Sequence, residues 1–448
     1  MLPVNQARDY AQSLVEKARA AGADAADAVY SGHESQSVGV RLGELEHVDS
    51  SEGEELGLRV FIGQRSATVA SSDFSAEALG ELVKRALAMA AEAPEDPFAG
   101  LAPPDMLARG TLPDVDAIDQ HRDEPLVLRE RALSAERAAM SVSGVTNSGG
   151  ASASYSSGTT ALATSTGFSG AYHATGHGCS VSVVAGEGSS MQRDSAWHGS
   201  RHFEDLDSPE ELGRLAGERA VARLSPGKPK PGRYPVLFDP RVAGSLLGHF
   251  AGAINGSAVA RKSSFLQDRL GRRVFAAGVQ IIDDPLRPRG LRSRPFDGEG
   301  LGVSRVALAE DGVLTTWMAE TASARQLGIQ PTGHAGRGAS GPPGAGPSNL
   351  YLEAGSRSRE QLLAAFPEAV LVTELIGQGV NTVTGDYSRG AAGFMVRDGA
   401  IAEPVAEITI ASNLIDMFAS LEPGSDLEFR RGVDAPTVLI PEMTVGAA

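Results

Sequence analysis

Three residues in the middle of the chain have the types and the spacing that metal chemistry requires. They are His173, His177 and Cys179, and two more histidines, His198 and His202, follow further along. Because 173, 177 and 179 have the same parity, an extended strand would point all three side chains to one face, with His198 and His202 on a neighbouring strand. Imidazole and thiolate are ligand types that zinc prefers. The pattern therefore allows a metal site and, with it, an autonomous metalloenzyme.

The composition around these residues favours a plainer interpretation. A structural zinc site needs four ligands held by tight loops, whereas the segment 144–201 is rich in Ser, Thr, Gly and Ala. Such a segment is typical of an ordinary sheet face, where His and Cys side chains meet polar cross-strand partners and solvent. We therefore predict no metal ligands in this chain and keep His173, His177 and Cys179 as the alternative.

Other reactive side chains lack the partners that catalysis needs. His334 lies in a glycine-rich loop and could titrate near neutral pH, but no nucleophile stands near it in the sequence. Ser388 lacks the Gly-x-Ser-x-Gly setting of serine hydrolases. Asp386 and Arg389, which flank it, are expected to form an ion pair or to anchor the backbone of a turn. We predict no catalytic residue here and keep His334, Asp386 and Arg389 as candidate substrate or partner contacts.

One helix stands out among the elements that would position such groups. An apolar run at 234–238 leads into Asp239 and Pro240, the residue types that favour a helix N-cap and first helical position. The helix is expected to continue through 242–254, and the basic pair Arg261 and Lys262 follows it. The stretch 242–260 carries no charge, but its glycines and polar residues predict a buried helix and loop rather than a membrane span.

The whole chain reads as an α+β protein of three domains. We expect an N-terminal α+β domain at 1–105, with helices on one face of an antiparallel sheet, and a strand-rich central domain at 106–228. A C-terminal β-rich domain at 229–448 is expected to contain a large mixed sheet or barrel. Proline-rich stretches near both boundaries support this division.

Apolar periodicity and turn residues predict the individual elements. The predicted helices are 76–91, 125–140 and 209–224, besides an amphipathic helix in the first twenty-two residues. The predicted strands of the first domain are 26–31, 37–42, 45–50, 56–62 and 65–70, and those near the C-terminus are 370–374, 380–384, 391–396, 408–411 and 437–440. Strands 303–308 and 313–318 flank a hairpin turn at Glu310-Asp311-Gly312. A mobile glycine- and proline-rich loop is expected at 332–348.

Charge and cysteine content exclude several functional classes. The net charge of −16 disfavours nucleic-acid binding, because that binding depends on lysine and arginine neutralising phosphates. Cys179 is the only cysteine, so no intrachain disulfide can form, which is typical of a reducing compartment. The first residues lack the basic and apolar regions of a signal peptide. We therefore expect a cytoplasmic protein with no membrane or nucleic-acid partner.

Several motifs together resemble one protein family. The runs 385–394, 404–411 and 441–446 carry the most specific likeness, and 296–300 and 333–336 stand between the helix and these runs in the expected order. With the strand and helix from 234 to 256, they resemble the TldD/TldE (PmbA) metallopeptidase family. Members of the TldD type carry His-Glu-x-x-x-His on this helix. The resemblance is specific over the C-terminal half of the chain and looser before it.

The resemblance implies that the zinc motif is missing here. The two histidine positions of the motif fall on Gly248 and Ala253, and the glutamate position falls on His249. Neither glycine nor alanine can coordinate zinc. The cysteine ligand that TldD has near its C-terminus is also absent from 426–448. The chain thus resembles TldE, with Gly248 and Ala253 expected to allow another element of the chain to pack closely against the helix, and contact across the TldD–TldE interface as the alternative. Arg261 and Lys262 are further candidate contacts.

This resemblance implies a role as the zinc-free subunit of a TldD–TldE heterodimer that degrades or processes small and unfolded polypeptides, including peptide-antibiotic precursors and antitoxins. Zinc is expected in the TldD partner and no cofactor in this chain, which should be inactive alone and form a homodimer without its partner. Two alternatives stay open. One is a non-enzymatic protein that modulates DNA gyrase, and the other is an autonomous metallopeptidase at His173, His177 and Cys179.

Overall fold

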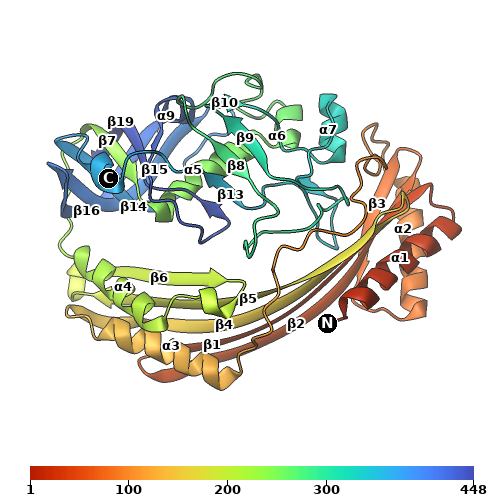
Figure 1. The fold of residues 1–448 in the computed structure, drawn as a ribbon, viewed down its shortest axis with the longest axis horizontal. Helices are drawn as coiled ribbons and strands as arrows, with labels where there is room; N and C mark the ends of the chain where they lie inside the picture. Colours follow the sequence, from red (N-terminus) through yellow and green to blue (C-terminus); the bar gives the residue numbers. More distant parts are fainter. Residues whose placement is uncertain (448) are drawn as a thin grey trace.

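The computed structural model describes residues 1–447. Figure 1 shows two layers: the first half of the chain forms a long curved sheet, and the C-terminal half faces its concave side. The sheet has six antiparallel strands in the order β3-β2-β1-β4-β5-β6. These strands are β1 (Ala25–Arg41), β2 (Glu44–Ile62), β3 (Arg65–Ser71), β4 (Val145–Thr164), β5 (Ser169–Ala185) and β6 (Gln192–Ser200).

The strands of this sheet are much longer than the sequence predicts. The predicted short strands 26–31 and 37–42 join into β1, and 45–50 and 56–62 join into β2. Gly32 pairs with Glu54 and His33 with Gly53, so the ladder continues through residues that resemble turn signals. A backbone ladder needs only a partner strand, and the polar side chains here point to solvent without interrupting it. The sheet runs through both the 1–105 and the 106–228 segments.

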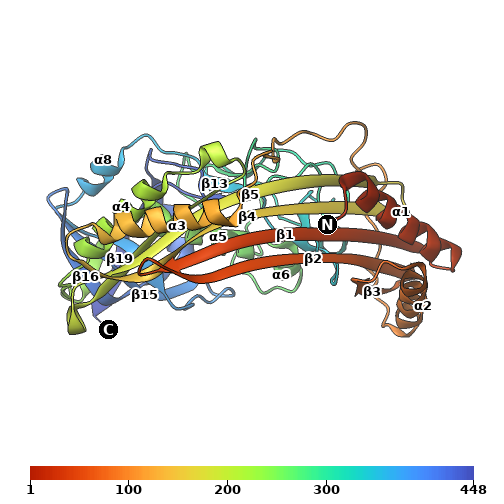
Figure 2. The same cartoon turned by 90° about the horizontal axis from the view of Figure 1, so that it is seen from below.

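Four helices cover the outer, convex face of the sheet (Figure 2). Helices α1 (Val4–Ala20) and α2 (Ala76–Glu92) pack at one end, and α3 (Pro125–Met140) and α4 (Pro209–Ala222) at the other. The side chains of Ser75 and Ser208 cap α2 and α4 by accepting backbone N–H groups. The apolar faces predicted for these helices are buried against the sheet, which explains why periodicity located them well.

The C-terminal half contains a closed five-stranded barrel of β7 (Gly232–Phe238), β14 (Glu368–Ile376), β15 (Asp386–Arg397), β16 (Ala400–Asn413) and β19 (Val438–Ala447). Pairing between β16 and β19 closes it, and β7–β14 is its parallel pair. The predicted α+β class with a C-terminal mixed sheet or barrel is confirmed. A predicted strand at 380–384 is wrong: this segment is a turn, from which Val380 forms one isolated bridge to Tyr387.

A second sheet in this half has the order β10-β9-β8-β13-β18. Its strands are β8 (Ile281–Asp283), β9 (Val306–Glu310), β10 (Val313–Leu314), β13 (Leu350–Leu352) and β18 (Val433–Asp434). Asp311 and Gly312 join β9 to β10 with φ angles of 46° and 75°, the left-handed pair of a type I′ hairpin turn. The predicted hairpin is therefore present. Short elements complete this half: α6 (Gly256–Ala260), α7 (Thr321–Leu327), β11 (Ala335–Gly336), β12 (Gly344–Ala345), α8 (Arg359–Leu363), α9 (Leu414–Ser420) and β17 (Glu422–Pro423).

The charge-free stretch 242–260 forms α5 (Pro240–Ala253) and α6, whose apolar side chains belong to the core of the C-terminal half. Within residues 1–447, no helix has the length and apolar character to cross a membrane. This agrees with the interpretation of the stretch as a buried helix and loop.

Candidate functional site

Helix α5 begins where the sequence predicts it. The side chain of Asp239 accepts the N–H of Arg241 at 3.0 Å, and Pro240 occupies the first turn, where a missing N–H costs nothing. Arg359 and Arg241 also pair with the Asp239 carboxylate. Burial alone would raise the pKa of Asp239, but these two arginines and the N–H contact lower it. The start of the helix is thus fixed by a charged cap.

The three motif positions have different surroundings on α5. No heavy atom would lie within 4 Å of a Cβ placed on Gly248, and the same holds for Gly252. Ala253 is buried, and its carbonyl accepts a hydrogen bond from the Ser264 hydroxyl. The expected close packing of another element is therefore wrong for Gly248, which faces open space. Its lack of a side chain is not explained by contacts within the described chain.

His249 points towards the barrel. Its ring meets the ring of Tyr387 edge-to-face, with centroids 6.0 Å apart, and its Nε2 is buried without a hydrogen bond among the described residues. Burial lowers the pKa of His249, and the neighbouring Arg389 guanidinium lowers it further. Gly248 and Ala253 have no donor atom in their side chains, so the three motif positions together lack the donor set of a zinc site. The residues present do not fit the metal that the family motif would hold.

The candidate contact residues are spread over the C-terminal half. Arg261 and Lys262 are exposed at the end of α6, where Lys262 has a left-handed φ of 56°. His334 is only 2% exposed, with Nδ1 2.8 Å from the Thr332 hydroxyl and Nε2 3.6 Å from Asp283. Burial and then Arg294 lower the pKa of His334 to about 4. The loop expected to be mobile thus holds a buried, neutral histidine at neutral pH.

Asp386 and Arg389 do not pair with each other in the described structure. Both belong to β15, and three residues of separation place them on opposite faces of the strand. Asp386 accepts hydrogen bonds from Thr384 at 2.7 Å and from Asn413 at 3.1 Å, so it does anchor the preceding turn. Arg389 instead lies beside Tyr387, on the side of α5.

His173, His177 and Cys179 share one face of β5, as their parity predicts, but they do not converge. A strand advances about 3.3 Å per residue, so His173 and His177 are roughly 13 Å apart along it. His173 contacts the Thr159 hydroxyl through Nδ1 at 2.9 Å. Cys179 is buried under α3 and α4, and burial raises the pKa of its thiol to about 11. Among residues 1–447, no three or more His, Cys, Asp and Glu side chains are grouped to hold a metal ion.

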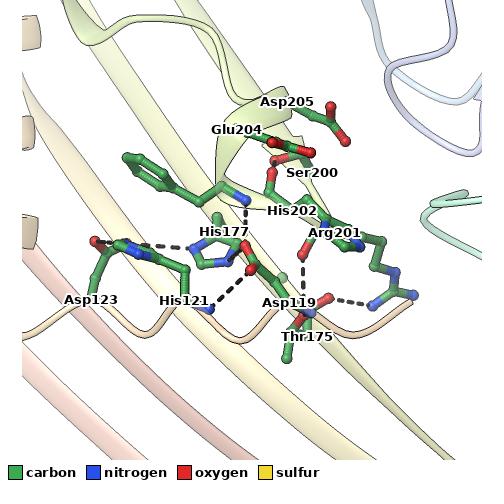
Figure 3. Close-up of polar contacts among 12 residues, drawn as sticks. Asp119, His121, Asp123, Thr175, His177, Ser200, Arg201, His202, Glu204 and Asp205 are labelled. Atoms are coloured by element: carbon green, nitrogen blue, oxygen red, sulfur yellow. Dashed lines mark hydrogen bonds and ion pairs between the residues drawn. The ribbon is translucent and has the colours of Figure 1, made fainter. Parts of the chain in front are cut away.

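His177 belongs instead to a compact charged group that the sequence did not reveal (Figure 3). Its Nε2 lies 3.2 Å from Asp119 and its Nδ1 3.5 Å from Asp123, so both ring nitrogens face carboxylates. Arg131 of α3 pairs with both Asp123 oxygens at 3.0 and 3.2 Å, and His121 contacts Asp123 at 3.0 Å. We call Asp119, His121, Asp123, Arg131 and His177 the His177 cluster.

The His177 cluster stabilises the fold. Its carboxylates come from the irregular segment before α3, which crosses β5 and is fixed there by a Thr175–Ala117 backbone bond of 2.9 Å. Burial acts to raise the pKa of Asp123, but its contacts with His177, His121 and Arg131 lower it well below the ordinary range. The cluster therefore ties a long connection to the outer face of the sheet.

A cavity that was not anticipated from the sequence lies where β6 and α4 approach the C-terminal half. It is a cleft of about 910 Å³ between β6 and α4 on one side and the start of α5, β14 and the segment 426–435 on the other. Arg219, Arg241 and Arg431 line it together with Trp197. The Arg431 side chain is held against one wall of the cleft. That side chain covers the Trp197 ring at 5.3 Å and donates to the Arg241 carbonyl. We call this cavity the Arg219 cleft.

Comparisons with known proteins agree over the whole length of the chain. Models of the PmbA/TldA metallopeptidase family match domain 1 at residues 26–90, the central domain at 119–224 and the C-terminal domain at 231–447. The chain is 39% identical to metalloprotease PmbA of Escherichia coli O157:H7 over 411 residues, covering 91% of this chain and 89% of that protein. It is 36% identical to a metalloprotease PmbA homologue of Haemophilus influenzae over 445 residues, covering 99% and 96%.

Solved structures share the fold. A Bacteroides thetaiotaomicron protein, provisionally described as a modulator of DNA gyrase, matches with a TM-score of 0.92 at 24% identity over the whole of both chains. TldE from Thermococcus kodakarensis matches with a TM-score of 0.86 at 18% identity, covering 97% of this chain and 99% of that one. The family predicted from the sequence is therefore confirmed: this chain belongs to the TldD/TldE (PmbA) metallopeptidase family.

Proposed function

We propose that this chain is the TldE-like subunit of a two-subunit zinc metallopeptidase, in which a TldD-like partner holds the zinc and the catalytic residues. The observation that carries the proposal is helix α5, which offers Gly248 and Ala253 at the two positions where TldD has histidine ligands. Hydrogen and methyl side chains donate nothing to a metal. Within a metallopeptidase family, a chain with this helix depends on a partner for zinc chemistry.

The surroundings of the helix support the same role. Gly248 and Gly252 leave one side of α5 open, with no described atom in contact range of an added Cβ. An open helix face in an otherwise packed domain is a suitable place for a partner subunit or a substrate to approach the backbone closely. The proposed substrates are small or unfolded polypeptides, such as peptide-antibiotic precursors and antitoxins. Without its partner, the chain is expected to form a homodimer.

The test is peptidase activity on an unfolded protein substrate, measured with this chain, with its TldD-like partner and with both. We expect cleavage only in the mixture and its loss when a zinc chelator is added. A matched control replaces the partner by a variant that lacks its motif glutamate, which should abolish cleavage in the mixture. Chelator-sensitive cleavage by this chain alone would overturn the proposal.

A non-enzymatic role towards DNA gyrase is the second candidate, because two structural neighbours are provisionally described as gyrase modulators. Affinity purification of the tagged chain distinguishes the two functions. Recovery of a TldD-like protein in equal amount supports the peptidase subunit. Recovery of gyrase without a TldD-like protein supports the modulator.

A further inference from the structure

The Arg219 cleft has the dimensions of a ligand site. Its volume of about 910 Å³ lies within the range of roughly 300–1,000 Å³ that is typical of such sites. Its walls come from β6 and α4 of the curved sheet layer and from α5 and β14 of the C-terminal half (Figure 1). Side chains that are distant in the sequence therefore face a common space.

Arg219 is the unusual charge in this space. Among the described residues, no carboxylate lies within 4.0 Å of its guanidinium group, and its hydrogen bond to the Ser195 carbonyl is long, at 3.4 Å. Burial, followed by repulsion from Arg241, lowers the pKa of Arg219 to about 10, although Asp194 and Asp239 act in the opposite direction. The side chain thus remains charged at neutral pH, half-buried beside two other cations. A negatively charged group next to it would remove an electrostatic cost.

Nearby arginines on the same walls are compensated. Arg223, one helical turn beyond Arg219, pairs with Asp194 and Glu374. Arg241 pairs with Asp194 at 2.9 Å and with Asp239 at 3.4 Å. These arginines have carboxylate partners, so the lack of one is specific to the position of Arg219.

The carboxylates that line the cleft pair or form hydrogen bonds elsewhere, so none of them forms a direct ion pair with Arg219 among the described residues. Asp194 and Asp239 pair with the arginines named above, and Asp434 accepts the N–H groups of residues 430, 431 and 432. The other lining carboxylates are Glu374 with Arg223, Glu428 with Arg430, Asp426 with Thr437, and Glu218, which is exposed and lies 3.8 Å from Arg214.

Exposed apolar side chains lie beside these charges. Trp197 is 45% exposed although it stands on a strand that faces the C-terminal half, and Leu215 and Ile401 are also exposed at the cleft. The Arg431 guanidinium lies over the Trp197 ring at 5.3 Å, and the side chain of Trp197 still remains exposed. The cleft therefore presents both a cation and an apolar surface. A peptide that carries an acidic side chain next to an apolar one complements both.

We propose that the Arg219 cleft binds an acidic–apolar segment of an extended polypeptide, with a carboxylate on Arg219 and an apolar side chain against Trp197 and Leu215. The inference rests on the proposed function in one respect, namely that the segment belongs to a polypeptide substrate. It names a chemical class for that substrate and a site on this chain that holds it.

Tryptophan fluorescence of the isolated chain provides the test. Of the two tryptophans, Trp197 lines the cleft and Trp317 is buried at 5% exposure, so a ligand in the cleft changes mainly the Trp197 emission. The probe is a blocked pentapeptide with one glutamate between two leucines. Its matched probe has glutamine instead, and inorganic phosphate serves as a simple anion. We expect saturable binding of the glutamate peptide, with the glutamine peptide and phosphate at least about tenfold weaker.

Substitutions of single arginines assign the binding to Arg219. Arg219→Gln should weaken the glutamate peptide by about tenfold or more and leave the glutamine peptide unchanged. Arg137→Gln is the matched control, because Arg137 is exposed on the neighbouring helix α3 and does not line the cleft. Trp197→Phe should remove the fluorescence signal while calorimetry still reports binding.

Equal affinity for both peptides, equal effects of the two arginine variants, or tighter binding of phosphate would each overturn the proposal. Because these measurements use the chain without a TldD-like partner, their failure leaves the peptidase-subunit proposal intact. Failure of the mixed-subunit activity assay would likewise leave the peptide-binding result intact.

Discussion

The His177 cluster and the Arg219 cleft are both rich in charge, but the charges are arranged differently. In the His177 cluster, Asp123 contacts three cationic or imidazole groups, and both ring nitrogens of His177 face carboxylates. In the cleft, Arg219 lacks a carboxylate partner within the described chain and lies beside other arginines. The first region is closed and self-compensated, whereas the second is open and unbalanced.

This difference shows which kind of polar group indicates function in this molecule. Histidine and cysteine on β5 have the residue types of a metal site, yet His173 contacts Thr159, His177 faces two carboxylates and Cys179 is buried under two helices. Arg219 on α4 belongs to no recognisable sequence motif, yet its guanidinium group has no carboxylate partner among the described residues. Buried or half-buried charges are normally paired with an opposite charge, so an arginine without a carboxylate beside it is the more informative observation. The comparison leads to three predictions, ordered by the size of the effect.

The largest effect is expected from Asp123→Ala in the His177 cluster. This change leaves Arg131 and His177 buried without their shared carboxylate. Removal of one member of a buried charged group costs about 3–5 kcal/mol of unfolding free energy. Urea unfolding followed by circular dichroism measures the change, with Asp105→Ala at an exposed position as the control. A loss below about 0.5 kcal/mol, as is usual at surface positions, would contradict the structural role of the cluster.

A pair of arginine variants tests the contrast between the two regions directly. Arg131→Gln removes two hydrogen bonds to Asp123 and should lower the unfolding free energy by about 1.5–3 kcal/mol. Arg219→Gln removes a charge that Arg241 and Arg431 repel and that Asp194 and Asp239 attract without a direct ion pair, so the stability should stay within about 0.5 kcal/mol of the parent chain.

Urea unfolding at pH 7 measures the unfolding free energy of both arginine variants under the same condition. A destabilisation by Arg219→Gln as large as that by Arg131→Gln would mean that Arg219 has an internal partner. The assignment of the cleft as an open, unbalanced site would then be incorrect.

The sequence predicted those parts of the fold that depend on local patterns. Helix α3 was predicted at 125–140 and observed as Pro125–Met140, and the cap at Asp239 and the hairpin turn at Asp311 and Gly312 were also correct. Each of these signals comes from neighbouring residues. The lengths of β1 and β2 were not predictable in the same way, because Gly32 and Gly53 stay in the ladder only through their cross-strand partners.

The functional site was less predictable, because its residues come together through contacts between segments that are distant in the sequence. The resemblance located Gly248, His249 and Ala253 on one helix, and that helix is present. It did not reveal that Gly248 faces open space or that His334 is buried, since both depend on segments far away in the sequence. The cleft combines Trp197, Arg219 and Arg431 from three separate elements, and no local pattern connects them.

The smallest effect is expected from Gly248→Ala on α5, for which Gly213→Ala on α4 serves as the control. An alanine at Gly248 meets no described atom within 4 Å, so Gly248→Ala should stabilise the chain by about 0.5–1 kcal/mol through helix propensity. Gly213 is the matched control on α4, because its added Cβ would lie 2.2 Å from the Ala135 carbonyl oxygen. Gly213→Ala should destabilise by about 1–3 kcal/mol through overpacking.

Two measurements test the glycine variants: thermal unfolding of the isolated chain and the affinity of each variant for the TldD-like partner. Stabilisation by Gly248→Ala shows that the glycine serves no packing role within this chain. If the same variant also weakens association with the partner, the open face of α5 is the surface that the partner approaches. A loss of stability at Gly248 comparable to that at Gly213 would instead show that a neighbouring element presses on α5. The open face, and its contrast with the packed face of α4, would then have to be abandoned.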